Sequence, residues 1–389
     1  MTSPHIISRT IIDDLISFDT TSRDSNLALV GYVEDYLEGH GIASELHYND
    51  DGTKANLYAT IGPDIAGGII LSGHTDVVPV DGQNWTSDPF SVVEKDGRLI
   101  GRGTSDMKSF LGVVLAAVPL FKAQDLNIPI HIAFSYDEEV GCVGVRGLID
   151  ALNKKGNKPA MCLVGEPTGM EVVISHKGKR AYQVRVSGKP AHTSRAPEGV
   201  NAIENAARLI AFIADMNAEF ARSGPFDDMF NISHTTCLTS LIQGGVAQNI
   251  VPESCSFSFE FRFLPDQNPV DLLAPIKEFA KNTLETEMQK SAPDARIEII
   301  ETLAYPGLNT SPEADIVSFG KGLCQRNTHG KVDFGTEGGL FQQDADIETI
   351  VCGPGYIAQA HTPDEFIDIE QIAKCEAFMQ RLLEAVRSD

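Results

Sequence analysis

The sequence predicts an α/β fold with a smaller α+β domain inserted into it. Its 389 residues exceed what one compact core usually holds, which indicates two domains. Segments typical of strands alternate with segments typical of helices as far as Gly178, and this alternation is the mark of an α/β architecture. The pattern changes near Gly178 and returns after Ile297, as expected if a second domain interrupts the first.

In the first part of the chain, apolar spacing separates helices from strands. Residues 68–73 form a continuous apolar run between glycines, which is typical of a strand buried on both faces. Gly39 and Gly41 are helix stop signals. The expected helices are 9–16, 28–38 and 110–121, and the expected strands are 68–73, 128–135 and 161–164.

The inserted segment follows a different pattern. Residues 180–187 alternate between apolar and polar side chains, which predicts a strand with one solvated face. A helix over 201–220, strands over 235–243 and 255–263, and a helix over 272–287 follow. This block is about the size of a small open-faced α+β domain. We therefore expect a discontinuous larger domain, 1–177 with 294–389, and an inserted lid domain, 178–293.

Charge and composition limit the partners and the compartment. The formal net charge of -23 argues against nucleic acid or anionic membranes as partners, because an acidic surface repels both. The longest apolar runs fall short of the ~20 residues that a membrane span needs. Residues 1–14 show no secretory signal, and seven cysteines without a Cys-x-x-Cys pair are typical of reduced thiols. A cytoplasmic protein is expected.

Polar residues cluster where the predicted strands of the larger domain end. Ligands bind at the carboxyl ends of strands in open α/β sheets, so these side chains should lie at one edge. They are His74, Asp76, Asp106, Glu138, Glu139, Glu166 and His361.

Two imidazoles and three carboxylates are a suitable ligand set for a pair of divalent ions such as zinc, cobalt or manganese. Two ions ~3.5–4 Å apart need a bridging group, and Asp106 is the natural bridge. One ion would then bind His74 and Glu166, and the other Glu139 and His361.

Two carboxylates remain for other roles. Asp76 can accept the second imidazole N–H of His74 and fix its tautomer. Glu138 adjoins a ligand but would point elsewhere, which leaves it free as a general base. Each of these residues alone could be an ordinary surface or turn residue, and only the combination favours catalysis.

Five motifs in this order resemble the co-catalytic metallopeptidase and deacylase superfamily. They are 74–79 (HTDVVP), 103–108 (GTSDMK), 137–139 (DEE), 165–168 (GEPT) and 359–361 (QAH). The resemblance implies a zinc-peptidase-like catalytic domain with a mixed central sheet flanked by helices. It also implies a ferredoxin-like lid and dimerisation domain, two Zn²⁺ or Co²⁺ ions, a homodimer, and hydrolysis of a small N-acyl amino acid.

The same resemblance assigns roles to three residues of the lid. His192 matches a histidine that reaches the neighbouring subunit and stabilises an oxyanion. Asn249 matches a substrate-contacting asparagine, and Arg262 matches an arginine that binds the substrate α-carboxylate. His192 could instead be an ordinary surface histidine, and Arg262 could pair with Glu260 on the strand surface.

The substrate is indicated by residues 333–342, 353–355 and 359–366, which resemble the acetylornithine deacetylase subgroup. In this reading Glu337 would recognise the side-chain ammonium of N2-acetyl-L-ornithine. Gly338 and Gly339 depart from the alanine-containing version of this loop. A desuccinylase acting on succinyl-diaminopimelate, another deacylase or dipeptidase of the superfamily, and a catalytically silent binding protein remain alternatives. No Gly-x-Ser-x-Gly elbow supports a nucleophilic serine.

Overall fold

Two units make up the part of the chain that the computed structural model describes, residues 6–388. The first five residues, which belong to the segment where no secretory signal is expected, lie outside the described residues. The larger unit contains the chain up to Ser175, Leu308–Lys331, and the segment from Thr336 onward. The smaller unit contains His176–Gly307 and Val332–Gly335.

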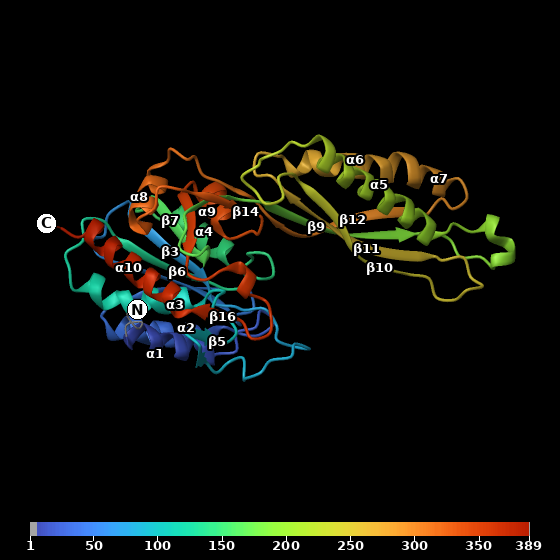
Figure 1. Cartoon of the computed structure of the whole chain (residues 1–389). Helices are drawn as coiled ribbons and strands as arrows, with labels where there is room; N and C mark the ends of the chain where they lie inside the picture. The colour runs from blue at the N-terminus through green and yellow to red at the C-terminus, as the bar shows by residue number, and fades with distance from the viewer. Residues whose placement is uncertain (1–5, 389) are drawn as a thin grey trace. The chain divides into compact units, whose positions relative to one another are not determined.

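The larger unit is built on a mixed sheet (Figure 1) with the order β1-β2-β6-β3-β7-β15-β8-β13, and β14 pairs with β8. Its centre is parallel, because β3 runs parallel to β6 and β7, and β7 runs parallel to β15. The central strands are β3 (Ile69–His74), β6 (Ile130–Ser135), β7 (Met161–Pro167) and β15 (Glu348–Gly353). The flanking strands are β1 (Ser44–Tyr48), β2 (Ala55–Ile61), β8 (Val173–His176), β13 (Leu308–Asn309) and β14 (Gly330–Val332).

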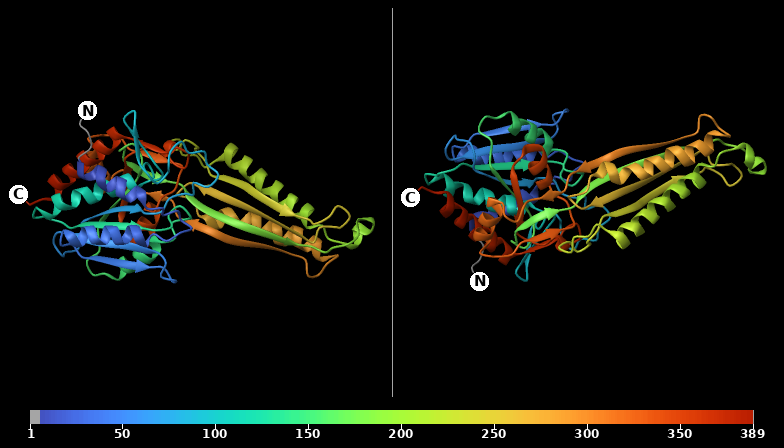
Figure 2. Two further views of the ribbon diagram at one scale, coloured as in Figure 1. Left: turned by 90° about the horizontal axis from the view of Figure 1, so that it is seen from below. Right: turned by 90° about the horizontal axis from the view of Figure 1, so that it is seen from above.

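Helices cover both faces of this sheet. Side chains alternate along a strand, so Ile69 and Leu71 of β3 join one hydrophobic core while Ile70 faces the other way. The helices that share this core are α1 (Ile6–Ser17), α2 (Leu27–Gly39), α3 (Lys108–Lys122), α8 (Asp315–Cys324) and α10 (Ile369–Val386). Among them, α1, α3 and α10 lie side by side (Figure 2). On the opposite face α4 (Val145–Lys154) contacts α9 (Gly338–Ala345).

A small sheet with the order β16-β5-β4 also belongs to the larger unit. Its strands are β4 (Val93–Lys95), β5 (Arg98–Ile100) and β16 (Phe366–Asp368). Because β5 pairs with β16, the loop that follows β5 is brought next to the loop that precedes β16.

The smaller unit is a four-stranded antiparallel sheet with the order β10-β11-β9-β12 and helices on one face (Figure 1). Alternate residues of β11, such as Phe257 and Phe259, pack against Leu209 of α5 and Ile276 of α6 in a separate core. Its strands are β9 (Gly178–Ser187), β10 (Thr236–Gly244), β11 (Ser254–Phe263) and β12 (Arg296–Tyr305). Its helical segments are η1 (Thr193–Glu198), α5 (Ala202–Ser223), α6 (Pro269–Glu278), η2 (Phe279–Glu285) and α7 (Thr286–Gln289).

The helices and strands expected from apolar spacing are confirmed in type. The predicted end of the insert at residue 293 differs from the structure, because β12 pairs with β9 from Arg296 opposite Ser187 to Tyr305 opposite Lys179. The smaller unit therefore runs on to Gly307 and also takes in residues 332–335. Within residues 6–388, none of the helices combines the length and apolar character that crossing a membrane requires.

The carboxyl ends of β7 and β15 approach so closely that only glycine fits at one position. A Cβ on Gly353 would lie 1.8 Å from the carbonyl oxygen of Gly165. We therefore expect Gly353→Ala to destabilise the larger unit by roughly 1–3 kcal/mol, because the two strands must separate.

Gly322 is the matched control, since a Cβ there meets nothing within 4 Å and the residue lies inside α8. Gly322→Ala should raise stability by about 0.5–1 kcal/mol through helix propensity. Thermal unfolding of both variants checks the sign of each effect, and equal shifts of the two midpoints would contradict the close approach.

Candidate metal centre

The parallel centre of the large sheet brings the polar residues predicted at strand ends to one edge. His74 ends β3, Glu166 lies near the end of β7, and Glu138 and Glu139 follow β6. His361 lies in the loop after β15, beyond η3 (Ile357–Gln359). Because β6, β3, β7 and β15 are neighbours that run in the same direction, their carboxyl ends meet.

Asp106, which precedes α3, lies between the two histidines. Its Oδ1 is 3.0 Å from Nε2 of His74, and its Oδ2 is 3.1 Å from Nε2 of His361. The two oxygens of one buried carboxylate thus face two different imidazoles. A group that bridges two ions has to present its oxygens in this way.

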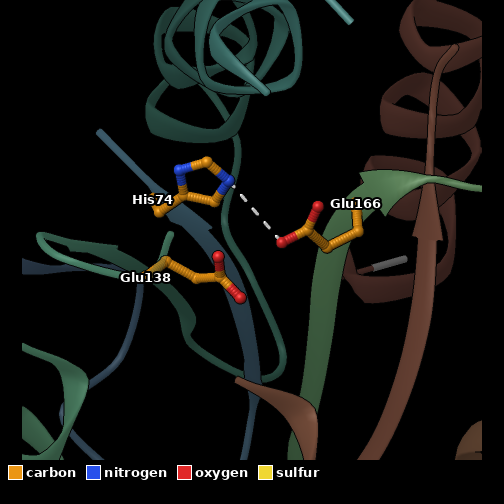
Figure 3. A group of neighbouring side chains, drawn as sticks. All are labelled: His74, Glu138 and Glu166. Atoms are coloured by element: carbon orange, nitrogen blue, oxygen red, sulfur yellow. Dashed lines mark ion pairs between the residues drawn. The ribbon is translucent and has the colours of Figure 1, made fainter. Parts of the chain in front are cut away.

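Each histidine also has a second carboxylate beside it. Nε2 of His74 is 3.6 Å from Oε1 of Glu166, and Nε2 of His361 is 3.1 Å from Oε2 of Glu139. Figure 3 shows His74, Glu138 and Glu166 converging from three segments of the chain. In two overlapping groups, His74 with Glu138 and Glu166, and His74 with Asp106 and Glu139, the potential ligand atoms lie within 4.8 Å of one another.

The carboxylates crowd one another, and their pKa values show it. Burial and the neighbouring Asp106 raise the pKa of Glu139 to about 7 and hold the pKa of Glu166 well above its ordinary value. Hydrogen bonds to Asp106 and Glu139 raise the pKa of His361 to about 10. Burial alone would raise the pKa of Asp106, but the hydrogen bonds from His361 and His74 outweigh it and lower the pKa. The cluster of carboxylates therefore attracts protons and other cations.

These residues fit a pair of divalent cations. Imidazole nitrogen and carboxylate oxygen are the donors that zinc and similar ions take. Oε1 of Glu139 is buried and makes no hydrogen bond, as expected of an atom that has a ligand role. Nδ1 of His74 lies 2.8 Å from the backbone carbonyl of Asp76, to which it donates, so Nε2 faces the carboxylates.

Asp76 has a different principal contact from the predicted one. Its carboxylate Oδ1 is 3.6 Å from Nδ1 of His74, which is farther than its own backbone carbonyl. The carboxylate instead accepts the backbone N–H groups of Glu138 at 3.1 Å and Glu139 at 3.2 Å, and the hydroxyl of Ser22 at 2.7 Å. Its main effect is therefore to fix the backbone of the Glu138–Glu139 segment.

Glu138 was expected to point away from the ligands, but it points into the same space as His74 and Glu166 (Figure 3). Its Oε1 accepts one weak hydrogen bond, from the thiol of Cys142 at 3.3 Å. Burial, and then the carboxylates of Glu139, Glu337 and Asp106, raise its pKa well above the ordinary value, against the opposing effect of His74. A carboxylate with few partners and a raised proton affinity is suited to take a proton.

Glu337 lies beneath this edge and is only 1% exposed. Its Oε2 accepts the hydroxyl of Ser72 at 3.2 Å, and its Oε1 accepts the hydroxyl of Ser135. The predicted contact with a substrate ammonium needs an accessible carboxylate, and this geometry does not offer one. Burial raises the pKa of Glu337 to about 7, although the Ser135 hydrogen bond and His74 oppose the shift.

The three predicted lid residues all lie in the smaller unit. His192 is exposed, and its Nδ1 accepts the N–H of Ser194 at 3.2 Å, which leaves the hydrogen on Nε2. Asn249 is exposed, on the segment paired with His192 through the His192–Ile250 bridge.

Arg262 is half-buried on β11, where it forms an ion pair with Glu260 on the strand surface. Its Nε donates to Glu260 at 3.0 Å, and its Nη1 donates to the hydroxyl of Tyr305 at 2.9 Å.

Two residues near the site were not foreseen from the sequence. Ser22 binds Asp76, and Lys54 pairs with Asp137 at 2.5 Å, beside Glu138. Both come from segments without a recognisable motif. Asp137 has a φ of 54°, and His361 has a φ of 61°. Left-handed backbone at non-glycine residues costs energy and is concentrated at functional sites.

A carboxylate that faces two imidazoles at the ends of parallel strands is typical of the class of proteins that bind metal ions with these side chains. The model of peptidase family M20/M25/M40 matches residues 70–385. The chain belongs to this family.

Its relatives agree in length and fold. An acetylornithine deacetylase of Myxococcus xanthus is 33% identical over 96% of this chain and 96% of its own. The structure of an M20 family metallo-carboxypeptidase from Sulfolobus solfataricus has a TM-score of 0.75 at 19% identity, covering 97% of this chain and 98% of the other. A Bacillus subtilis structure, described as a dinuclear metal-binding M20 peptidase, has a TM-score of 0.70 at 13% identity and covers 97% of each chain.

Family membership and the site together make this chain a metal-dependent hydrolase that acts on amide bonds.

Proposed function

We propose that this hydrolase removes the acetyl group of N2-acetyl-L-ornithine to give L-ornithine and acetate, a step of arginine biosynthesis. The observation that carries this proposal is the full-length match to a relative named for that reaction. The loop with Thr336 and Glu337 supports the same choice by its sequence resemblance to that subgroup alone, because the Glu337 carboxylate is buried. We place the reaction in the cytoplasm, since all seven cysteines are free thiols and such thiols persist in a reducing compartment.

The residues that would hold two Zn²⁺ or Co²⁺ ions follow from the contacts of the two histidines. His74 and Glu166 would hold one ion, His361 and Glu139 would hold the other, and Asp106 would contribute to both. Bound ions of this kind polarise an amide carbonyl and lower the pKa of a water molecule between them.

Glu138 is the base in this proposal. Its carboxylate takes a proton from the attacking water and passes it to the nitrogen of the leaving amine. Asp76 keeps Glu138 and Glu139 in place by accepting both of their backbone N–H groups. A tight segment of this kind limits the loss of entropy when substrate binds.

The lid residues would bind the remainder of the substrate. Arg262 offers a guanidinium fork to the α-carboxylate, which would displace its present contact with Glu260. Asn249 is exposed and can donate to the same part of the substrate. The Nε2–H of His192 is free to donate to the oxyanion, which we propose belongs to the neighbouring subunit of a homodimer.

The edge of the smaller sheet supports the homodimer. β10 is an edge strand, and its exposed apolar residues Leu238, Leu241 and Ile242 are 63%, 69% and 57% exposed. A long apolar edge strand favours pairing with another strand, and a twofold axis would pair it with its own copy.

We predict that Leu241→Glu converts the homodimer to a monomer, because it puts a charge on the apolar edge strand that each copy would bury. Sedimentation velocity over a range of concentrations checks this result. Val270→Glu, at a residue of α6 that is 66% exposed, is the control and should leave the dimer intact. A wild-type protein that is monomeric at every concentration would contradict the proposal.

The proposed substrate is tested by measuring free amine released from N2-acetyl-L-ornithine and from N-succinyl-diaminopimelate, with added Zn²⁺ or Co²⁺ and with a chelator. We expect cleavage of the acetyl substrate alone, abolished by the chelator. Cleavage of the succinyl substrate alone would replace the proposed substrate. Cleavage of neither would reject both substrates and direct the search to other acylated amino acids and dipeptides.

We predict that Glu138→Gln lowers kcat by roughly 10²–10⁴-fold, because the amide cannot accept the proton. Metal content, measured by atomic absorption after dialysis, should remain close to that of the wild type. Glu370→Gln, in an exposed ion pair with Lys374 on α10, is the matched control and should leave kcat unchanged. Normal turnover in Glu138→Gln would refute the role of this residue as the base.

A further inference from the structure

The structure assigns a positioning role to Arg102 and Glu365, a buried ion pair for which the sequence indicated no function. We propose that this pair fixes the segment of Asp106 against the segment of His361, and so sets the spacing of the two metal-binding groups. The inference rests on the proposed two-metal function and adds residues that contact neither the ions nor the substrate.

Glu365 controls the Asp106 segment through its backbone. Its Oε1 accepts the N–H of Ser105 at 2.9 Å and the N–H of Asp106 at 3.0 Å. Glu365 belongs to the loop that also carries His361, and its own backbone carbonyl accepts the N–H of Gly101 at 2.9 Å. The carboxylate therefore holds the bridging ligand by two charge-assisted hydrogen bonds from the opposite loop.

Arg102 completes the connection in the other direction. Its Nη1 donates to Oε2 of Glu365 at 2.5 Å, and its Nη2 donates to Oε1 of Gln83 at 2.7 Å. Nε2 of Gln83 in turn donates to the backbone carbonyl of His361 at 3.2 Å. The loop of Asp106 thus holds the backbone of His361, while the loop of His361 holds the backbone of Asp106.

The burial of this pair argues for positioning rather than stability. The Arg102 side chain is 1% exposed and that of Glu365 is 0% exposed. Removing two charges from water costs so much that a buried ion pair contributes little net stability compared with a well-packed apolar pair. The pair does fix the relative orientation of two loops, since the planar guanidinium of Arg102 donates to Glu365 and Gln83 at once.

A metal site needs ligands whose relative orientation is fixed. Asp106 must present one oxygen to each ion, and this works only if its backbone keeps a fixed distance from His361. Losing an outer partner of a metal ligand typically costs about 10–100-fold in metal affinity. The clamp formed by Arg102, Glu365 and Gln83 should therefore appear in metal affinity.

The experiment is a calorimetric titration of chelator-treated protein with Zn²⁺, for the wild type, Arg102→Met, Glu365→Gln and Gln83→Leu. We expect the wild type to bind two ions and each clamp variant to bind at least one of them about 10–100-fold more weakly. Gln83 is only partly buried and uncharged, so Gln83→Leu leaves no buried charge unpaired and tests the clamp even if Arg102→Met fails to fold.

Arg98→Met is the matched control. Arg98 on β5 pairs with Asp368 on β16 at 3.1 Å, close to the clamp in the chain but at the surface. This variant should keep the affinity of the wild type. In the clamp variants, kcat at limiting Zn²⁺ should fall and recover at saturating Zn²⁺, while KM changes little.

Failure of the clamp and failure of the two-metal function give different results. Wild-type affinity for both ions in all folded clamp variants would overturn the clamp and leave the two-metal function intact. A wild-type protein that binds no more than one Zn²⁺ would overturn the two-metal function on which the clamp depends.

Discussion

Buried carboxylates crowd around Asp106 at one edge of the large sheet. Glu139 and Glu166 lie beside the same two histidines as Asp106, and their pKa values are raised by burial and by its charge. Such a cluster is expensive for a protein to fold around unless positive charge compensates it. In the proposed function two cations would compensate it, and the same charges would activate water and an amide carbonyl. The charges that would neutralise the buried carboxylates are therefore the same charges that the reaction would use.

The fold meets this requirement by assembling the cluster from segments far apart in the chain. Parallel neighbouring strands deliver His74, Glu139 and Glu166 to one edge, and the loop after β15 adds His361. Backbone contacts then remove the remaining freedom. The carboxylate of Asp76 holds two consecutive amides after β6, and that of Glu365 holds two consecutive amides before α3. Asp76 and Glu365, which are not assigned to an ion, thus fix the backbone of two proposed metal ligands, Glu139 and Asp106.

Much of this could be predicted from the sequence, because local spacing determines it. An apolar run between glycines predicted β3, and further apolar runs predicted β6 and β7. Histidines and acidic residues at strand ends predicted which side chains converge. Long-range pairing could not be predicted in the same way. Nothing within residues 296–305 shows that β12 pairs with β9, since its partner lies more than a hundred residues earlier. The inward direction of Glu337 and the engagement of Asp76 with backbone amides also depend on side-chain geometry. Glu365 lies in a segment with a family resemblance, but its contact with Arg102 becomes visible only when the pairing of β5 with β16 brings the two loops together.

Anomalous X-ray diffraction at the zinc absorption edge, from crystals grown with Zn²⁺, tests directly whether two ions share the Asp106 carboxylate. We predict two anomalous peaks, one on each side of the Asp106 carboxylate, with His74 and Glu166 around one and His361 and Glu139 around the other. A single peak among these residues, or two peaks that do not share Asp106, would contradict the two-metal site.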